Sequence, residues 1–251
     1  HEVESLHKQG YFLAATDLLR QKVGTAPIFG FKDPRVAKLL PFWKDVFKYF
    51  QFDVCYLLAL RHPLSVVKSL SKRDGLEAAQ SYLLWIGHVI TSLVESKGNK
   101  RALIDYDLLV QEPERELNRI AGQLDLKVDS QNLQSYKSDF LDLGLRHTVY
   151  RLADLDTDDA CPPLVREVYQ KLQSVTSAQI GIDDRSLQRQ IKHWSDELAR
   201  MNTALVLADT FSSRGLEVGR LITKREEEVF LLNQGVAERE GQLERLERTV
   251  E

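Results

Sequence analysis

The sequence predicts an α/β protein with a parallel sheet, followed by a long helical segment. An unbroken apolar run over 55–60 is typical of a parallel strand that is covered on both faces. Pro63 follows this run and suits the first position of a helix, where a missing N–H costs nothing. Beyond Pro163 the chain has no proline and keeps apolar residues at helical spacing, which predicts helix to its end.

Two further passages repeat the step from strand to helix. The first predicted strand, over 26–31, ends in Lys32-Asp33-Pro34-Arg35, and apolar residues over 39–47 predict the next helix. The third predicted strand, over 101–106, precedes a helix that Pro113 opens. An apolar helix is expected over 76–94, between the second and third strands. Cationic residues therefore follow the first two predicted strands.

The second strand delivers Arg61 to the start of the helix that Pro63 opens. Ser69 comes eight residues after Arg61, about two turns into that helix. We therefore expect a guanidinium and a hydroxyl to meet one anion, with the helix dipole adding to the attraction. The alternative interpretation is a strand, turn and helix with a structural role only.

These segments together resemble the sulfotransferase family over roughly Pro27 to Gln173. That family uses 3′-phosphoadenosine 5′-phosphosulfate (PAPS) as sulfonate donor on a P-loop-kinase-like α/β fold. Arg61 and Ser69 match the pair that holds the donor's 3′-phosphate. Tyr106-Asp107-Leu108-Leu109 with Pro113 resembles the Tyr-Glu-Asp-Leu element, whose Tyr lies against the donor adenine. The resemblance therefore implies that Arg61, Ser69 and Tyr106 bind the cofactor.

Two further segments are similar to particular branches of the family. The segment from Phe31 to Arg35 resembles the Lys-Asp-Pro segment of tyrosylprotein-type and many bacterial members, whose Lys lies near the transferring sulfonate. By this resemblance Lys32 is the expected catalytic residue, with Arg35 as a second cation for the cofactor. The segment Gly144-Leu145-Arg146-His147 resembles one in the carbohydrate-acting bacterial branch. This implies a carbohydrate acceptor.

The chain also departs from the family. Nothing before Pro27 supplies the first strand and the Gly-rich loop that cradle the 5′-phosphosulfate, so we expect an N-terminally truncated domain that is inactive by itself, or a degenerate member that has lost donor binding. Pro34 stands where cytosolic members carry a catalytic His, so the general base is not identified. Leu108 replaces the usual Asp of the third element. His62 replaces the usual Asn or Asp of the turn, and we expect it to cap the helix. The competing function is a non-catalytic relic that serves as an assembly or tethering module.

Composition excludes several classes of function. The chain has 251 residues, a formal net charge of −3 and no Lys/Arg-rich block, which argues against a nucleic-acid partner. Its two cysteines imply no disulfide framework and suit a reducing, cytoplasmic compartment, with Cys55 in the core. The histidines show no zinc-ligand spacing, so no metal is expected. No apolar run reaches the roughly 20 residues that span a bilayer, so no transmembrane segment is expected.

The sequence divides into a sulfotransferase-like domain over 1–178 and a helical, coiled-coil segment over 183–251. Apolar residues recur seven apart in this segment, with Leu232 and Leu246 between them: Ile222, Val229, Val236, Leu243 and Val250. Arg225 and Arg239 fill the other d positions, which lowers stability and restricts register. We expect self-association or a partner helix here, and a further domain such as a glycosyltransferase beyond residue 251. A solvated charged helix is the alternative.

Overall fold

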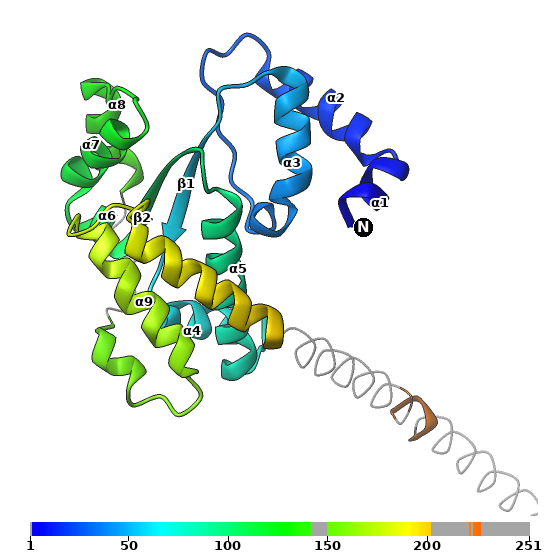
Figure 1. The fold of residues 1–251 in the computed structure, drawn as a ribbon, viewed down its shortest axis with the longest axis vertical. Helices are drawn as coiled ribbons and strands as arrows, with labels where there is room; N and C mark the ends of the chain where they lie inside the picture. The colour runs from blue at the N-terminus through cyan, green and yellow to red at the C-terminus, as the bar shows by residue number, and fades with distance from the viewer. Residues whose placement is uncertain (1, 142–149, 202–220, 222, 227–251) are drawn as a thin grey trace, which may run out of the picture. The chain divides into compact units, whose positions relative to one another are not determined.

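The computed structural model describes residues 2–141, 150–201, 221 and 223–226. Backbone contacts divide the chain into two compact units, His1–Asp196 and Glu197–Glu251. The described part of the first unit is mixed α/β and mostly helical, with a small parallel sheet (Figure 1). Its elements are α1 (Glu2–Lys8), α2 (Tyr11–Val23), α3 (Val36–Phe50), β1 (Cys55–Leu60), α4 (Pro63–Asp74), α5 (Ala78–Glu95), β2 (Lys100–Asp105), α6 (Tyr106–Gln111), α7 (Pro113–Gln123), α8 (Ser130–Ser135), the π-helix η1 (Tyr136–Phe140), the 3-10 helix η3 (Leu152–Leu155) and α9 (Pro163–Thr176). A further helix begins at residue 185.

The sheet consists of β1 and β2, paired in parallel from Cys55 opposite Lys100 to Leu60 opposite Asp105. The crossover between them runs through α4 and α5, as parallel strands require a long connection. Because the two strands end side by side, the residues that follow Leu60 and Asp105 emerge at one edge of the sheet. The predicted strands over 55–60 and 101–106 are thus confirmed, the second shifted by one residue.

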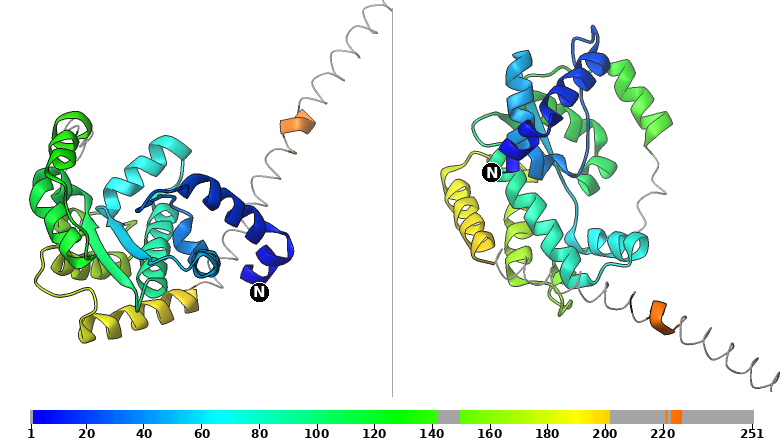
Figure 2. Two further views of the ribbon diagram at one scale, coloured as in Figure 1. Left: turned by 90° about the horizontal axis from the view of Figure 1, so that it is seen from above. Right: turned by 90° about the vertical axis from the view of Figure 1, so that its right-hand side faces the viewer.

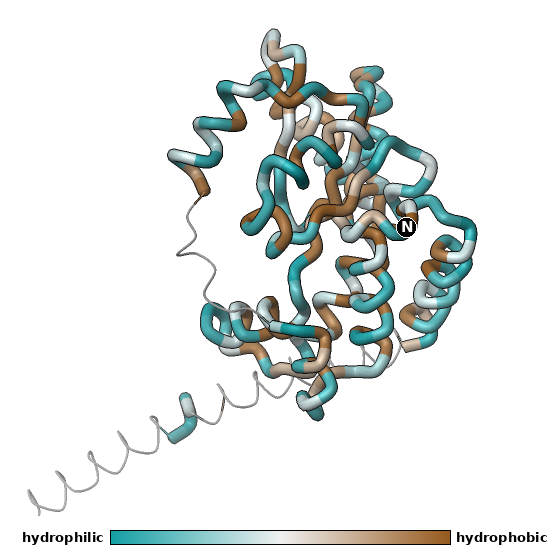
Figure 3. The backbone as a smooth tube through the Cα atoms, turned by 90° about the vertical axis from the view of Figure 1, so that its left-hand side faces the viewer, coloured by the Kyte–Doolittle hydropathy of each residue, from teal (hydrophilic) through white to brown (hydrophobic). Residues whose placement is uncertain are grey.

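Helices cover β2 on both faces. Ala102 and Ile104 pack against Ile120 of α7 and against Leu124, the C-cap of that helix. Alternation along the strand turns Arg101, Leu103 and Asp105 to the opposite face, where α9 lies and where Arg101 Nη1 donates to the Leu93 carbonyl of α5. In Figure 3 the helical segments of the tube mix hydrophobic and hydrophilic residues along their length, as helices with one buried face do. The core of the unit therefore centres on β2.

Strand β1 differs from its prediction, because only one of its faces is covered. Leu58 and Leu60 are buried, but Cys55, Leu57 and Ala59 are exposed. Cys55 is therefore on the surface and not in the core. The physical reason is that α7 packs on β2 and leaves the same face of β1 without a helix among the described residues.

The strand predicted over 26–31 does not form in the structure. This segment is irregular, and Ile28, Phe29 and Phe31 are exposed. Instead of pairing with a strand, Phe31 packs its ring against Trp43 and Phe47 of α3, with centroids 5.2 and 6.3 Å apart. Helix α3 itself confirms the helix predicted over 39–47.

The N-terminal helices pack on α3. Ala15 and Leu19 of α2 form a buried cluster with Phe42 and Val46 of α3, and partly buried side chains of α1 join it. Figure 2 shows α1 and α2 (dark blue) alongside α3. None of the helices within the described ranges has the length and apolar character needed to cross a membrane.

The helix that begins at residue 185 contributes to the first unit. Leu187, Ile191 and Trp194 are buried, and Trp194 Nε1 donates to Glu167 Oε1 of α9 at 2.8 Å. The first residues of the predicted segment 183–251 therefore belong to the α/β unit. Leu221 and residues 223–226 are helical, and the rest of the predicted heptad seam lies outside the described residues.

Candidate functional site at the carboxyl ends of the strands

Arg61 and Tyr106 meet at the edge of the sheet where both strands end. Arg61 follows Leu60, the last residue of β1, and Tyr106 follows Asp105, the last residue of β2. The Arg61 guanidinium carbon lies 4.7 Å from the centre of the Tyr106 ring, which is a cation–π contact. The structure thus brings together two of the predicted site residues from segments that are far apart in the sequence.

The backbone of Arg61 is held by α5. Trp85 Nε1 donates a hydrogen bond to the Arg61 carbonyl at 3.1 Å. The Arg61 side chain is half-buried and forms no ion pair with another described residue. A guanidinium that stacks on an aromatic ring and lacks a carboxylate partner retains its charge and its hydrogen-bond donors for an anion.

The first turn of α4 begins directly beside Arg61. Pro63 is its first residue, and His62 is the N-cap, accepting a hydrogen bond at Nδ1 from the Leu64 N–H at 3.2 Å. The prediction that His62 caps this helix is therefore confirmed. The N-terminus of a helix attracts anions through its free N–H groups and its dipole, so the α4 dipole and the Arg61 charge act in the same place.

The opposite wall of the site is built by β2 and α6. Asp105 caps α6, accepting from the backbone N–H groups of Asp107 at 2.8 Å and Leu108 at 3.1 Å. Burial raises the pKa of the Asp105 carboxyl, against the lowering effect of these two bonds. Nearby, the buried carboxylate of Glu116 pairs with Arg119 at 2.7 Å. Asp105 and Glu116 are thus engaged in fixing α6 and α7.

Two other predicted site residues, Lys32 and Arg35, come directly before α3. Lys32 is exposed in the irregular segment before α3. Arg35 is also exposed and forms a two-pronged ion pair with Asp33, with Nε–Oδ1 and Nη2–Oδ2 distances of 2.9 and 2.6 Å. Among the described residues, no hydrogen bond, ion pair or ring contact joins Lys32 or Arg35 to Arg61 or Tyr106.

The ion pair with Arg35 lowers the pKa of Asp33, chiefly through the side-chain hydrogen bond. The charge of Arg35 is therefore balanced within its own turn. Ser69 is exposed on α4. The segment from Gly144 to His147 lies outside the described residues.

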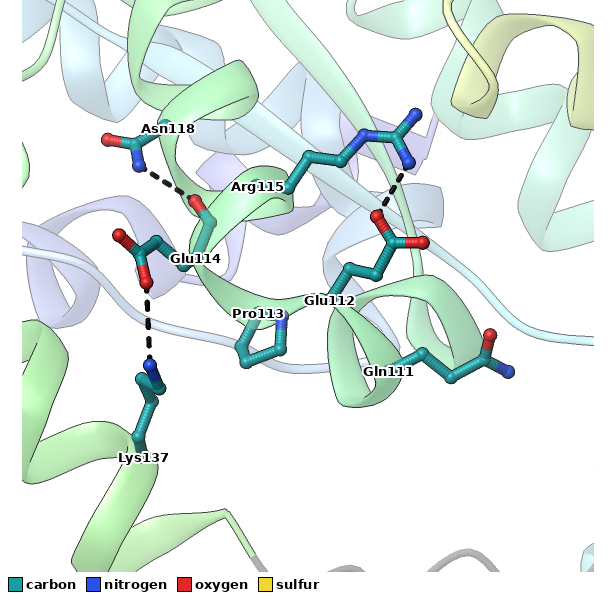
Figure 4. A pocket seen from close by; sticks show the side chains of 7 residues that line it. All are labelled: Gln111, Glu112, Pro113, Glu114, Arg115, Asn118 and Lys137. Atoms are coloured by element: carbon teal, nitrogen blue, oxygen red, sulfur yellow. Dashed lines mark hydrogen bonds and ion pairs between the residues drawn. The ribbon is translucent and has the colours of Figure 1, made fainter.

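A pocket of about 570 Å³ opens where α6 passes into α7 (Figure 4). Its walls come from the end of α6, the first two turns of α7 and η1: Gln111, Glu112, Pro113, Glu114, Arg115, Asn118 and Lys137. The four charges are paired with one another, Arg115 with Glu112 at 2.6 Å and Lys137 with Glu114 at 3.4 Å. This pairing leaves the pocket without an uncompensated charge.

Comparisons of the chain with models of protein families, with curated proteins and with solved structures found no match. Across the described ranges, no three His, Cys, Asp or Glu side chains cluster as metal ligands would. The functional interpretation therefore depends on the sequence motifs and on the geometry around Arg61.

Sequence reasoning missed two residues that hold this site. Trp85 supports Arg61 from a helix 24 residues further along the chain, and no local pattern predicts such a contact. Asp105 had a usable signal, because an Asp immediately before a short helical segment is a preferred N-cap.

Proposed function

We propose that this chain is a PAPS-dependent sulfotransferase domain that holds the donor's 3′-phosphate at Arg61. The observation that carries the proposal is the half-buried Arg61, which stacks on Tyr106 beside the start of α4 and has no carboxylate partner among the described residues. Ser69 supplies a hydroxyl to the same phosphate, and the Tyr106 ring lies against the adenine. The finer fold that goes with this function is the P-loop-kinase-like sheet.

The proposed reaction transfers a sulfonate group in line to an acceptor hydroxyl. The acceptor oxygen forms a bond to sulfur, the bond from sulfur to the 5′-phosphate oxygen breaks, and adenosine 3′,5′-bisphosphate leaves. The hydroxyl proton passes to a base that the described residues do not identify. Lys32 neutralises the negative charge that develops on the transferring group and the leaving phosphate, and Arg35 adds a second cation once an anion competes with Asp33 for it.

The proposed acceptor is a carbohydrate, on the strength of the segment from Gly144 to His147, and the proposed compartment is the cytoplasm. The support for this compartment is that the two cysteines, Cys55 and Cys161, imply no disulfide framework. The heptad residues over 222–250 are proposed to pair with a second copy or with a partner helix.

Calorimetry with adenosine 3′,5′-bisphosphate tests the proposal. Arg61→Ala is expected to weaken binding by about 2 kcal/mol or more, because it removes one partner of a charge-assisted contact. Arg73→Ala is the matched control, since Arg73 lies at the other end of α4 and pairs with Asp74 at 2.6 Å. Equal affinity of the wild type and Arg61→Ala would refute the assignment.

The second candidate is a non-catalytic relic of the same fold that tethers partners through its helical segment. The observation that favours it is the exposed position of Lys32, which no described contact links to Arg61. Assays of sulfonate transfer separate the two candidates. A complete protein that binds adenosine 3′,5′-bisphosphate but transfers no sulfonate from PAPS to any acceptor would support the relic.

A further inference from the structure

His62 is enclosed on all sides at the point where β1 passes into α4. The exposed fraction of His62 is 0%. The imidazole packs edge-on against the ring of Tyr169 from α9, with centroids 4.8 Å apart, and beside Tyr150, at 5.5 Å. The residue is therefore sealed between the turn that carries Arg61 and two segments that come later in the chain.

The two ring nitrogens of His62 have different partners, and these fix the tautomer. Nδ1 accepts from the backbone N–H of Leu64 at 3.2 Å, so it carries no proton. Nε2 lies 3.2 Å from the carbonyl oxygen of Arg151 and therefore donates to it. One neutral ring thus caps α4 and ties the start of that helix to the segment before η3.

We propose that His62 is a positioning residue that makes anion binding by Arg61 and the first turn of α4 depend on pH. This inference rests on the proposed function, because the anion in question is the 3′-phosphate of the donor. A neutral His62 holds the first turn of α4 and Arg61 in the arrangement that receives the phosphate. A protonated His62 cannot hold it, since a proton on Nδ1 would face the N–H of Leu64, donor against donor.

The groups around His62 decide how strongly it resists protonation. Burial lowers the pKa of His62, against smaller raising effects from the Arg151 carbonyl and from the carboxylates of Asp154 and Asp107. The remaining neighbours are the phenols of Tyr150 and Tyr169, whose rings pack on it. The Arg61 cation comes directly before it in the chain and opposes a second positive charge.

A charged imidazole would attract a phosphate if it stayed in place. It does not stay in place, because the buried ring has no water to solvate the charge, and its Nδ1 already faces a donor. Protonation therefore accompanies opening of the cap, and the anion loses the ordered first turn of α4. Binding of the phosphate and protonation of His62 are thus mutually exclusive. The affinity for the phosphate therefore decreases as the pH is lowered.

The test compares the wild type with His62→Asn and His62→Ala in calorimetry with adenosine 3′,5′-bisphosphate between pH 8 and pH 5. Asn keeps a cap acceptor without titrating in this range, and Asn is the residue type that N-caps favour. At pH 8 we expect His62→Ala to bind about fivefold more weakly than the wild type, and His62→Asn, which keeps the cap acceptor but loses the bond to the Arg151 carbonyl, to bind more tightly than His62→Ala. At pH 5 the ratio of wild-type to His62→Asn affinity is expected to be at least about threefold lower than at pH 8. Protonation of the ligand itself cancels in this ratio.

A second test uses the wild type alone, so that its result does not depend on how the variants fold. Nitrogen chemical shifts of the His62 ring are expected to report the tautomer with the proton on Nε2, and saturation with the ligand is expected to lower its titration midpoint further. A ratio that stays constant or rises as pH falls, or a midpoint that the ligand leaves unchanged, overturns the inference while the proposed function stands. Absence of binding by the wild type at pH 8 refutes the proposed function, and with it the role of His62 toward the phosphate.

Discussion

The turn after β1 and the turn before α3 show how two similar sequence patterns acquire different structures. In both, an apolar run is followed by a cation and a proline. Arg61 is held by Trp85 and stacks on Tyr106, and the helix after it has a side-chain cap in His62. Arg35 instead turns back on Asp33, and α3 begins without a side-chain cap. The difference arises because β1 has a strand partner and the segment over 26–31 has none among the described residues.

The largest expected effect tests whether the turn before α3, which carries Lys32, has a function. In the complete enzyme, Lys32→Ala is expected to lower kcat for sulfonate transfer by roughly a hundredfold or more and to leave affinity for adenosine 3′,5′-bisphosphate nearly unchanged, because Lys32 is proposed to act only on charge that develops in the transition state. Steady-state kinetics at saturating PAPS measure this. The control is Lys38→Ala, which removes a different exposed cation, located on α3. Turnover like that of the wild type would leave Lys32-Asp33-Pro34 as a structural turn.

A pair of tryptophan variants compares the packing of the two regions. Trp85→Phe is expected to lower the free energy of unfolding by about 1 kcal/mol more than Trp43→Phe, because only Trp85 donates a hydrogen bond to the backbone beside the site. Urea unfolding of both variants gives the difference. Equal losses would show that the bond from Trp85 to the Arg61 carbonyl adds no stability.

The pH dependence of stability tests the His62 cap in the turn after β1. The folded pKa of His62 lies below its ordinary value, so the unfolded chain takes up the proton first as pH falls. The free energy of unfolding is therefore expected to decline below about pH 6.5, by at most about 1.4 kcal/mol per pH unit, until the folded pKa is reached. His62→Asn is expected to remove this part of the decline. Parallel stability curves for the two proteins would contradict it.

The smallest expected effect concerns the exposed turn. Arg35→Gln is expected to raise the pKa of Asp33 toward its ordinary value, because the side-chain hydrogen bond from Arg35 is the main cause of the lowered pKa. Carbon NMR of the Asp33 carboxyl across acid pH measures the shift. An unchanged titration would mean that the ion pair does not form in solution.

The two turns also show how much of this molecule could be predicted from sequence. Local signals were sufficient for the helices that Pro63 and Pro113 open, because a proline at the first turn acts within its own helix. Local signals were also sufficient for β1 and β2, because these two apolar runs pair with each other in the sheet. They failed for 26–31, because a strand needs a partner and no local pattern shows whether one is present.

The candidate site was predictable to the same extent. Arg61 and Tyr106 could be placed together, because parallel strands end at one edge and both residues follow a strand directly. Trp85, Tyr169 and the Arg151 carbonyl could not be placed there, since they reach the turn from α5, α9 and the segment before η3 through packing alone. The exposed face of β1 was mispredicted for the same reason. An apolar run predicts a strand, but it does not show whether a helix covers each face of that strand.

The central claim is that Arg61 recognises a 3′-phosphate, and the ligand itself provides the most direct test. Adenosine 3′,5′-bisphosphate and adenosine 5′-monophosphate differ only in that phosphate, so their affinity ratio isolates its contribution. The wild type and Arg73→Ala are expected to favour the bisphosphate by about thirtyfold, which corresponds to about 2 kcal/mol. Arg61→Ala is expected to bind both ligands nearly equally. A ratio near one in the wild type, or a ratio that survives Arg61→Ala, would contradict the account.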